Sequence, residues 1–120
     1  MRRGEIWTVA AGGDYAGKPR PVVIVQDDRF DMTDSVTVCA FTTDPSDAPL
    51  MRLAIEPSDA NGLRAVCRLM VDKITTVRKA RAGIRIGRLA DEDIVRLNRA
   101  IIVFLGIAGP SPEEKRSTPG

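Results

Sequence analysis

An arginine and a threonine are the first residues of this chain whose placement could serve phosphate chemistry. Arg20 precedes an apolar, β-branched run at 22–25, and Thr42 follows a second apolar run at 36–41. If the two runs pair as an antiparallel hairpin, the simplest register pairs residues whose numbers add to 62, which sets Arg20 opposite Thr42. Directly opposed residues have Cβ atoms about 4.5–5.5 Å apart. A guanidinium group and a hydroxyl would then meet at the sheet edge, where both can bind oxygens of one phosphate.

Neighbouring residues suit the same ligand, but the pattern has an ordinary interpretation as well. Lys18 and Thr43 lie next to the pair, and a glycine-rich loop at 12–17 precedes Lys18. However, an arginine before a proline and a threonine pair at the end of a strand are also common edge and turn residues. Composition and spacing therefore leave a phosphate site and an ordinary sheet edge both open.

The composition excludes several kinds of active site. The chain has no histidine, which rules out histidine-based acid–base catalysis and every histidine-containing metal site. Its two cysteines, Cys39 and Cys67, each lie within an apolar run and form no CxxC pair. We therefore expect two small buried thiols rather than zinc ligands or a disulfide. No metal and no cofactor are expected.

Charged residues are segregated along the chain. Residues 27–59 hold eight acids and two bases, whereas residues 64–88 hold eight bases and one acid, Asp72. The pattern indicates either a solvated surface of uneven charge or a basic face that attracts nucleic acid or an acidic protein segment. The sequence does not decide whether the eight bases share a face.

The elements that must position these residues are mostly strands. The apolar pattern predicts strands at 5–9, 21–25, 36–41, 51–55 and 84–89, with one or two more within 63–77. In the strand at 51–55, Arg52 is expected to face solvent. These short strands suit a small, strongly curved antiparallel barrel or two-sheet fold.

One helix is expected, at 92–105, covering an open side of the strands. Asp91 is its predicted N-cap and Gly106 its C-terminal glycine. Its predicted apolar stripe consists of Ile94, Leu97, Ile101 and Leu105.

The chain is expected to form one domain, at 1–108, followed by a tail at 109–120. The tail is rich in proline and charge, and we expect it to be disordered. No apolar stretch is long enough to span a bilayer, and the first residues lack the pattern of a secretory signal. The expected location is the cytoplasm.

Four segments resemble the MazF/PemK/Kid family of toxins. Residues 3–7, RGEIW, are similar to the first strand of the family, and residues 18–25, KPRPVVIV, to its second strand, whose arginine is implicated in catalysis. Residues 39–43, CAFTT, resemble the third strand, and residues 71–77, VDKITTV, a later segment whose acidic residue is matched by Asp72. The resemblance runs from residue 2 to about 106 and implies a CcdB/PemK-type, SH3-like barrel.

The resemblance also implies an activity, that of a metal-independent, sequence-selective endoribonuclease. A ribose 2′-OH of single-stranded RNA would attack the adjacent phosphate and leave a 2′,3′-cyclic phosphate and a free 5′-OH. Arg20 would stabilise the phosphate and donate to the leaving group, because a guanidinium is a poor base. Thr42 would bind a non-bridging oxygen. The residues implied to contact RNA are Lys18, Thr43, Arg68 and Lys73.

Asp72 has three possible roles by this resemblance. It could accept a proton, orient Arg20, or form an ion pair with Lys73 or a nearby arginine. The chain departs from the family two residues earlier, where Kid-like members carry an arginine and this chain has Met70. That arginine is either missing, which would suit a binding module without catalysis, or replaced by Arg68.

The implied partners are an RNA substrate, a second copy of the chain in a homodimer, and an antitoxin; no membrane is involved. The antitoxin would wrap an acidic, initially disordered C-terminal segment onto the basic surface. The main alternative function is that of a CcdB-like toxin that binds and poisons DNA gyrase through the end of its helix. Residues 96–107 resemble that helix, although Leu105 stands where a tryptophan is typical.

Overall fold

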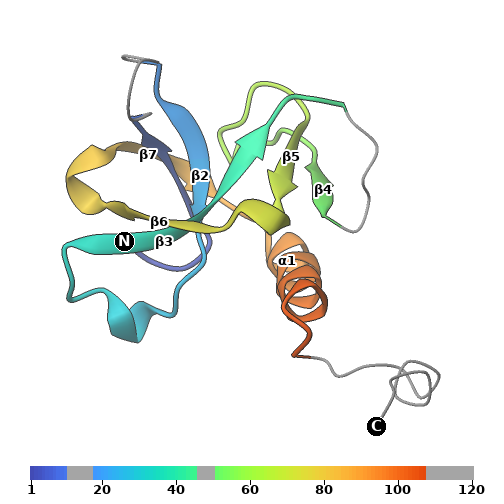
Figure 1. The fold of residues 1–120 in the computed structure, drawn as a ribbon. Coiled ribbons are helices and arrows are strands. Elements are labelled where there is room, and N and C mark those ends of the chain that lie inside the picture. Colours follow the sequence, from blue (N-terminus) through green and yellow to red (C-terminus); the bar gives the residue numbers. More distant parts are fainter. Residues whose placement is uncertain (11–17, 46–50, 108–120) are drawn as a thin grey trace, which may run out of the picture.

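A computed structural model of the chain describes residues 1–10, 18–45 and 51–107, which form a curled antiparallel sheet and one long helix (Figure 1). The strands are β1 (Glu5–Val9), β2 (Arg20–Ile24), β3 (Ser35–Thr42), β4 (Arg52–Ile55), β5 (Cys67–Met70), β6 (Thr75–Arg78) and β7 (Ala82–Arg88). Three short 3-10 helices connect them: η1 (Asp28–Phe30), η2 (Val71–Lys73) and η3 (Lys79–Arg81). The helix is α1 (Asp91–Phe104).

The sheet bends about β3, its longest strand. The strand order is β4-β5-β3-β2-β1-β7, and β6 also pairs with β3. On one edge β3 pairs with β2, whereas on the other it pairs with β6 near its start and with β5 at its end. Among the described strands, none of the pairings joins β4 to β7. The expected mainly β, antiparallel fold is confirmed, but the barrel is a curled sheet that does not close.

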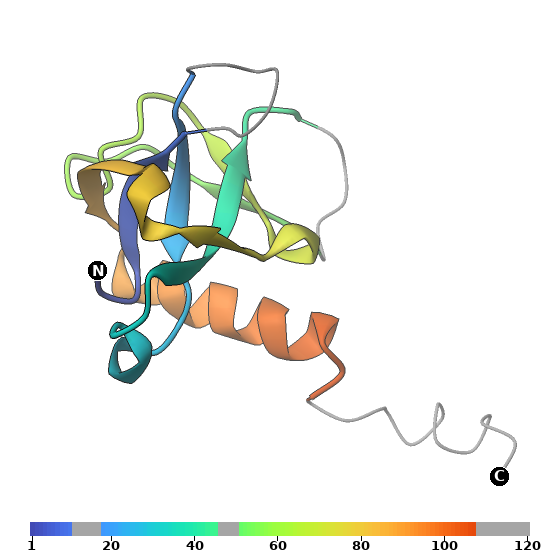
Figure 2. The ribbon, with the colours of Figure 1, turned by 60° about the vertical axis from the view of Figure 1, so that its left-hand side comes forward.

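Alternation along β3 supplies two core clusters, because successive side chains of a strand point to opposite faces. Cys39 and Phe41 belong to the larger core cluster, which α1 covers through Leu97. Val36 and Val38 belong to the smaller core cluster, on the opposite face. In Figure 2 the helix lies along one side of the strands, and it packs beside η2 and β4.

The helix confirms some of its predicted features and corrects others. Asp91 is its first residue rather than its N-cap; the cap is Ala90, without a side-chain hydrogen bond. Gly106 ends the helix as expected, with a φ of 72° that glycine adopts without strain. Of the predicted apolar stripe, Leu97 is buried, whereas Leu105 is 57% exposed. The reason is that α1 ends at Phe104, and from Ile102 onward its side chains are exposed.

The other elements follow the apolar pattern closely. One or two strands were expected within residues 63–77, and the structure has two, β5 and β6, separated by η2. The side chain of Arg52 is only 14% exposed, so its predicted solvent-facing position is wrong. The glycine-rich loop at 12–17 and the tail at 109–120 lie outside the described residues. No helix within the described ranges is long and apolar enough to cross a membrane.

Candidate functional site

The hairpin register that sets Arg20 opposite Thr42 is followed wherever β2 and β3 pair. The pairs are Val22 with Ala40, Val23 with Cys39 and Ile24 with Val38, and in each the numbers add to 62. Arg20 is the first residue of β2 and Thr42 the last of β3. The pairing ends at Val22 and Ala40; one more row of the same register would set Arg20 opposite Thr42 at the rim, by which we mean this shared end of β2 and β3.

A third residue joins this row from the next strand. Arg68 of β5 pairs directly with Thr42. Because opposed residues of neighbouring strands point to the same face, the Arg20–Thr42–Arg68 row carries a hydroxyl between two guanidinium groups. The row is on the face of the smaller core cluster, since Val22 and Ala40 form the next row on that face. Met70 belongs to this next row, opposite Arg52, so Arg68 is the arginine that faces Thr42.

Neither arginine of the row is neutralised within the described part of the chain. Arg20 is exposed and Arg68 half-buried, and the ion pairs of the described residues include neither. The Thr42 Oγ1 accepts a hydrogen bond from the backbone N–H of Asp44 at 3.1 Å. This contact orients the hydroxyl and leaves its own proton available to a ligand oxygen. The row therefore offers hydrogen-bond donors from three side chains on one face of the sheet.

Asp72 lies outside the row, in an ion pair with Arg52. The two side chains are 22% and 14% exposed, respectively, and the Arg52 guanidinium donates to the carboxylate. That hydrogen bond lowers the pKa of Asp72 below its ordinary value. Of the three roles considered for Asp72, an ion pair with an arginine is therefore the arrangement in the structure, and its role as a proton acceptor stays a prediction.

Arg52 is the functional-site neighbour that sequence reasoning missed. It pairs across the sheet with Met70, one row from the Arg68 position. The available signal was one of the two bases in the acidic segment 27–59, flanked by apolar residues of a strand. A base held in that setting needs an acid from another element, and η2 supplies Asp72.

The remaining predicted RNA contacts lie around the rim or beyond it. Lys18 and Thr43 are exposed beside Arg20 and Thr42. Lys73 is exposed on η2, next to Asp72 and away from the row. The eight bases of 64–88 are spread over both ends of β3, because Arg68 faces its last residue and Arg78 its first. They do not gather at the rim.

Both cysteines are free and buried, as predicted. The Cys39 Sγ donates to the carbonyl of Met70 at 3.4 Å. Burial raises the pKa of the Cys39 thiol to about 12, which keeps it protonated and unreactive near neutral pH. Among the described residues, no group of three or more cysteine or carboxylate side chains is placed to hold a metal ion.

A groove of about 480 Å³ opens at the rim, above the larger core cluster. Its lining residues come from β1, β2, β5, β7 and the segments beside β2, β3 and β5: Thr8, Pro19, Pro21, Thr43, Gly62, Leu63, Arg64, Ala65, Cys67, Ile84 and Ile86. Pro21 and Thr43 alternate with Arg20 and Thr42, respectively, and so point to the opposite face of the sheet. The rim therefore carries the arginine row on one face and this groove, which we call the mouth groove, on the other.

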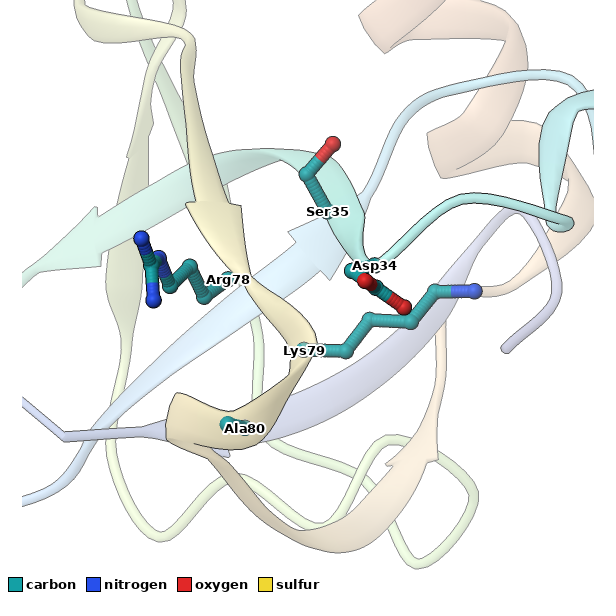
Figure 3. A pocket seen from close by; sticks show the side chains of 5 residues that line it. All are labelled: Asp34, Ser35, Arg78, Lys79 and Ala80. Atoms are coloured by element: carbon teal, nitrogen blue, oxygen red, sulfur yellow. The ribbon is translucent and has the colours of Figure 1, made fainter.

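A second hollow, of about 520 Å³, lies at the other end of β3 (Figure 3). It is lined by Asp34, Ser35, Arg78, Lys79 and Ala80. The Lys79 side chain runs past Asp34 while that of Arg78 points away from it (Figure 3). The Lys79 Nζ forms an ion pair with Asp31 at 2.7 Å. Lys79 of this hollow is therefore already paired with an acid, and the hollow lies at the end of β3 opposite the arginine row.

Comparison with known proteins connects this arrangement to a family. The chain is 62% identical over 109 residues to a protein of Mycolicibacterium smegmatis named probable endoribonuclease MazF, covering 91% of this chain and 100% of that protein. It is 28% identical over 116 residues to endoribonuclease MazF9 of Mycobacterium tuberculosis, covering 89% and 98% of the two chains.

Structural comparison and a family model agree with these relatives. A solved mycobacterial endoribonuclease in complex with its cognate antitoxin has a TM-score of 0.74 and 26% identity, covering 93% of this chain and 99% of that one. Residues 2–105 match the model of the PemK-like, MazF-like toxins of type II toxin–antitoxin systems. The resemblance found in the sequence is thereby confirmed, and the chain belongs to the PemK-like, MazF-like toxin family.

Proposed function

We propose that this toxin is an endoribonuclease that cleaves single-stranded RNA at selected sequences without a metal ion. The observation that supports the proposal is the pairing of Thr42 with Arg68 at the rim where β2 begins with Arg20, with no acid paired to either arginine in the described residues. The names of the two relatives support the same activity.

The row suits an attack by the ribose 2′-OH on the adjacent phosphate. As the pentacoordinate phosphorane forms, its non-bridging oxygens gain negative charge, and preorganised donors stabilise that charge more than they stabilise the ground state. Arg20 would bind the phosphate and donate to the departing 5′ oxygen. Thr42 would donate to a non-bridging oxygen, and Arg68 would supply the second guanidinium, in place of the arginine missing at Met70. The products would be a 2′,3′-cyclic phosphate and a 5′-OH.

The other predicted residues would act around this centre. Lys18 and Thr43, exposed at the rim, would hold the RNA strand on either side of the reacting phosphate. Lys73 would attract the strand from a greater distance. Asp72 remains the candidate proton acceptor, although its lowered pKa makes it a weak base, and holding Arg52 is the role that its contact supports.

We further propose two protein partners and a cytoplasmic site of action, where RNA is available. One partner is a second copy of the chain, since the family pairs through a two-fold interface. The other is an antitoxin that covers the rim with an acidic segment; a related structure is described as a complex with its cognate antitoxin. Its carboxylates would compete with RNA phosphate for the two arginines of the row.

A direct test is incubation of the purified protein with a long RNA in EDTA. We expect fragments with defined ends, a 2′,3′-cyclic phosphate on one side and a 5′-OH on the other, identified by end-specific ligation and sequencing. A supercoiling assay with DNA gyrase runs in parallel. Intact RNA together with gyrase inhibition would favour the CcdB-like alternative and overturn the proposed cleavage.

A further inference from the structure

The mouth groove is placed to receive a part of the substrate that the arginine row does not bind. It opens at the same rim as Arg20 and Thr42, but on the opposite face of the sheet. Its volume of about 480 Å³ lies within the range of about 300–1,000 Å³ found for small-molecule sites, which also favour the mouths of β-barrels. A strand of RNA that crosses the rim therefore passes from the row to the groove.

The walls of the groove are apolar, and its few polar groups are donors. Leu63, Ile84 and Ile86 contribute aliphatic surface, together with two prolines beside Arg20. Arg64 is the one charged side chain among the described residues that line it, and it is exposed and takes part in no ion pair of the described chain. The Thr8 Oγ1 accepts the backbone N–H of Ile84 at 3.0 Å, which leaves the hydroxyl proton free to donate.

The segment that carries Arg64 to the groove is held in place by a buried asparagine. Asn61 is 3% exposed. Its Oδ1 accepts from the N–H groups of Ser58 at 2.9 Å and Leu63 at 3.0 Å, and its Nδ2 donates to the carbonyl of Glu56 at 2.8 Å. Gly62 packs so closely on β7 that an added Cβ would lie 2.1 Å from the Ile86 carbonyl oxygen. The wall of the groove is thus formed before any ligand binds.

We propose that the mouth groove binds one unstacked nucleobase of the RNA, adjacent to the reacting phosphate, and that Arg64 selects its identity. The inference rests on the proposed endoribonuclease function. Single-stranded RNA is recognised through bases splayed out of the strand, whose faces pack on side chains while their edges form hydrogen bonds. Because Arg64 can only donate, the groove favours bases with a carbonyl oxygen on that edge, which are guanine, uracil and cytosine, over adenine.

Variants at Arg64 and Ile84 test this assignment. Arg64→Ala removes the donor, and Ile84→Glu, at a side chain that is 65% exposed, places a carboxylate in the groove without disturbing the core. Arg78→Ala is the matched control, since Arg78 is another exposed arginine without an ion pair in the described residues, at the far end of β3. Cleavage sites in a long RNA are mapped by sequencing, and kcat/KM is measured on a short RNA containing the preferred site.

We expect Arg64→Ala to lower kcat/KM by about tenfold or more and to flatten the base preference at one position next to the cleaved bond. The discrimination against adenine there should disappear, while preferences at other positions and the Arg78→Ala control remain unchanged. Ile84→Glu should weaken cleavage at every site. An Arg64→Ala enzyme with the wild-type cleavage pattern and rate would overturn the assignment. Loss of antitoxin binding by these variants, with an unchanged RNA pattern, would assign the groove to the antitoxin instead.

Binding separates this inference from the proposed function. Fluorescence anisotropy is measured with an RNA of the same sequence in which 2′-deoxy substitution at the cleavage site prevents attack. If the wild type binds this RNA but does not cleave the all-ribose form, the proposed catalysis fails, while weaker binding by Arg64→Ala would still support the groove. A wild type that neither cleaves nor binds RNA would overturn both.

Discussion

At the scale of residues, the site combines a row of donors that lack acidic partners in the described chain with one arginine that has such a partner. Arg20 and Arg68 flank Thr42 and form no ion pair with another described residue, whereas Arg52, one row away, is neutralised by Asp72. An arginine that is already paired has less to offer a phosphate, because binding would require the existing ion pair to break. The difference separates the residues expected to contact RNA from those expected to hold the fold.

Arg20→Ala should abolish most of the cleavage while leaving the protein folded. Arg20 is exposed and forms no ion pair among the described residues, so its removal costs the fold little. Loss of one donor to a developing oxyanion lowers kcat by about 100- to 1,000-fold. Initial rates on a short RNA and a thermal melting curve measure the two effects. Arg78→Ala serves as the control, and a fully active Arg20→Ala protein would remove Arg20 from the mechanism.

Asp72→Asn should act mainly on stability. The substitution leaves the partly buried Arg52 without its charged partner, at a cost of about 1–3 kcal/mol in the free energy of unfolding. Urea unfolding of the wild type and the variant at pH 7 measures that cost. If the RNA cleavage rate of the folded variant falls by more than a hundredfold, the proton-acceptor role of Asp72 is supported over the purely structural one.

The same ion pair gives the stability a defined dependence on pH. Because the hydrogen bond from Arg52 lowers the pKa of Asp72 in the folded state, the unfolded chain binds the proton more tightly. The stabilisation is therefore complete above the ordinary aspartate pKa of about 3.9 and is lost as the pH falls through the lowered folded value. Urea midpoints measured from pH 6 down to pH 2 should converge for the wild type and Asp72→Asn; a gap that persists at pH 2 would contradict this origin.

At the scale of elements, local sequence predicted the strands well and the contacts between distant segments poorly. The apolar runs located β2 and β3, and the simplest hairpin register, in which partner numbers add to 62, is the one that the observed pairs follow. The pairing between β5 and the end of β3 could not be predicted from the sequence, because nothing local distinguishes Arg68 from the other bases of its segment. The ion pair between Arg52 of β4 and Asp72 of η2 could not be predicted for the same reason, because a complementary charge twenty residues away in the sequence leaves no periodic signal.

The segment before β5 is a second case in which a single side chain sets the geometry of an element. Asn61→Ala should destabilise the protein by about 1–3 kcal/mol, since the backbone groups it satisfies are partly buried. Gly62→Ala should cost more, because its φ of +70° disfavours a side chain and the Ile86 carbonyl blocks the Cβ. Unfolding curves measure both effects. Asp59→Ala, at an exposed position of the same segment, should change little, and equal effects of all three substitutions would refute this account.

At the scale of the whole molecule, the rim and the end of α1 present different surfaces. The rim carries the basic arginine row on one face of the sheet and the mouth groove on the other. The last turn of α1 and the residues after it expose apolar side chains instead: Ile102, Val103, Phe104, Leu105 and Ile107. Contiguous apolar exposure of this kind marks a surface that another protein chain covers. We therefore expect the second copy of the homodimer to pack at this end of α1.

Val103→Asp tests that arrangement, because Val103 is 60% exposed and its replacement should leave the single chain folded. A carboxylate buried in the two-fold interface would face its symmetry mate and lose its hydration, which disfavours the dimer strongly. Light scattering at micromolar concentration should give a dimer for the wild type and a monomer for Val103→Asp. Arg99→Asp, a charge change on the same helix that removes no apolar surface, should stay dimeric. A monomeric wild type would contradict the predicted homodimer, whereas a dimeric Val103→Asp protein would place the interface on another face.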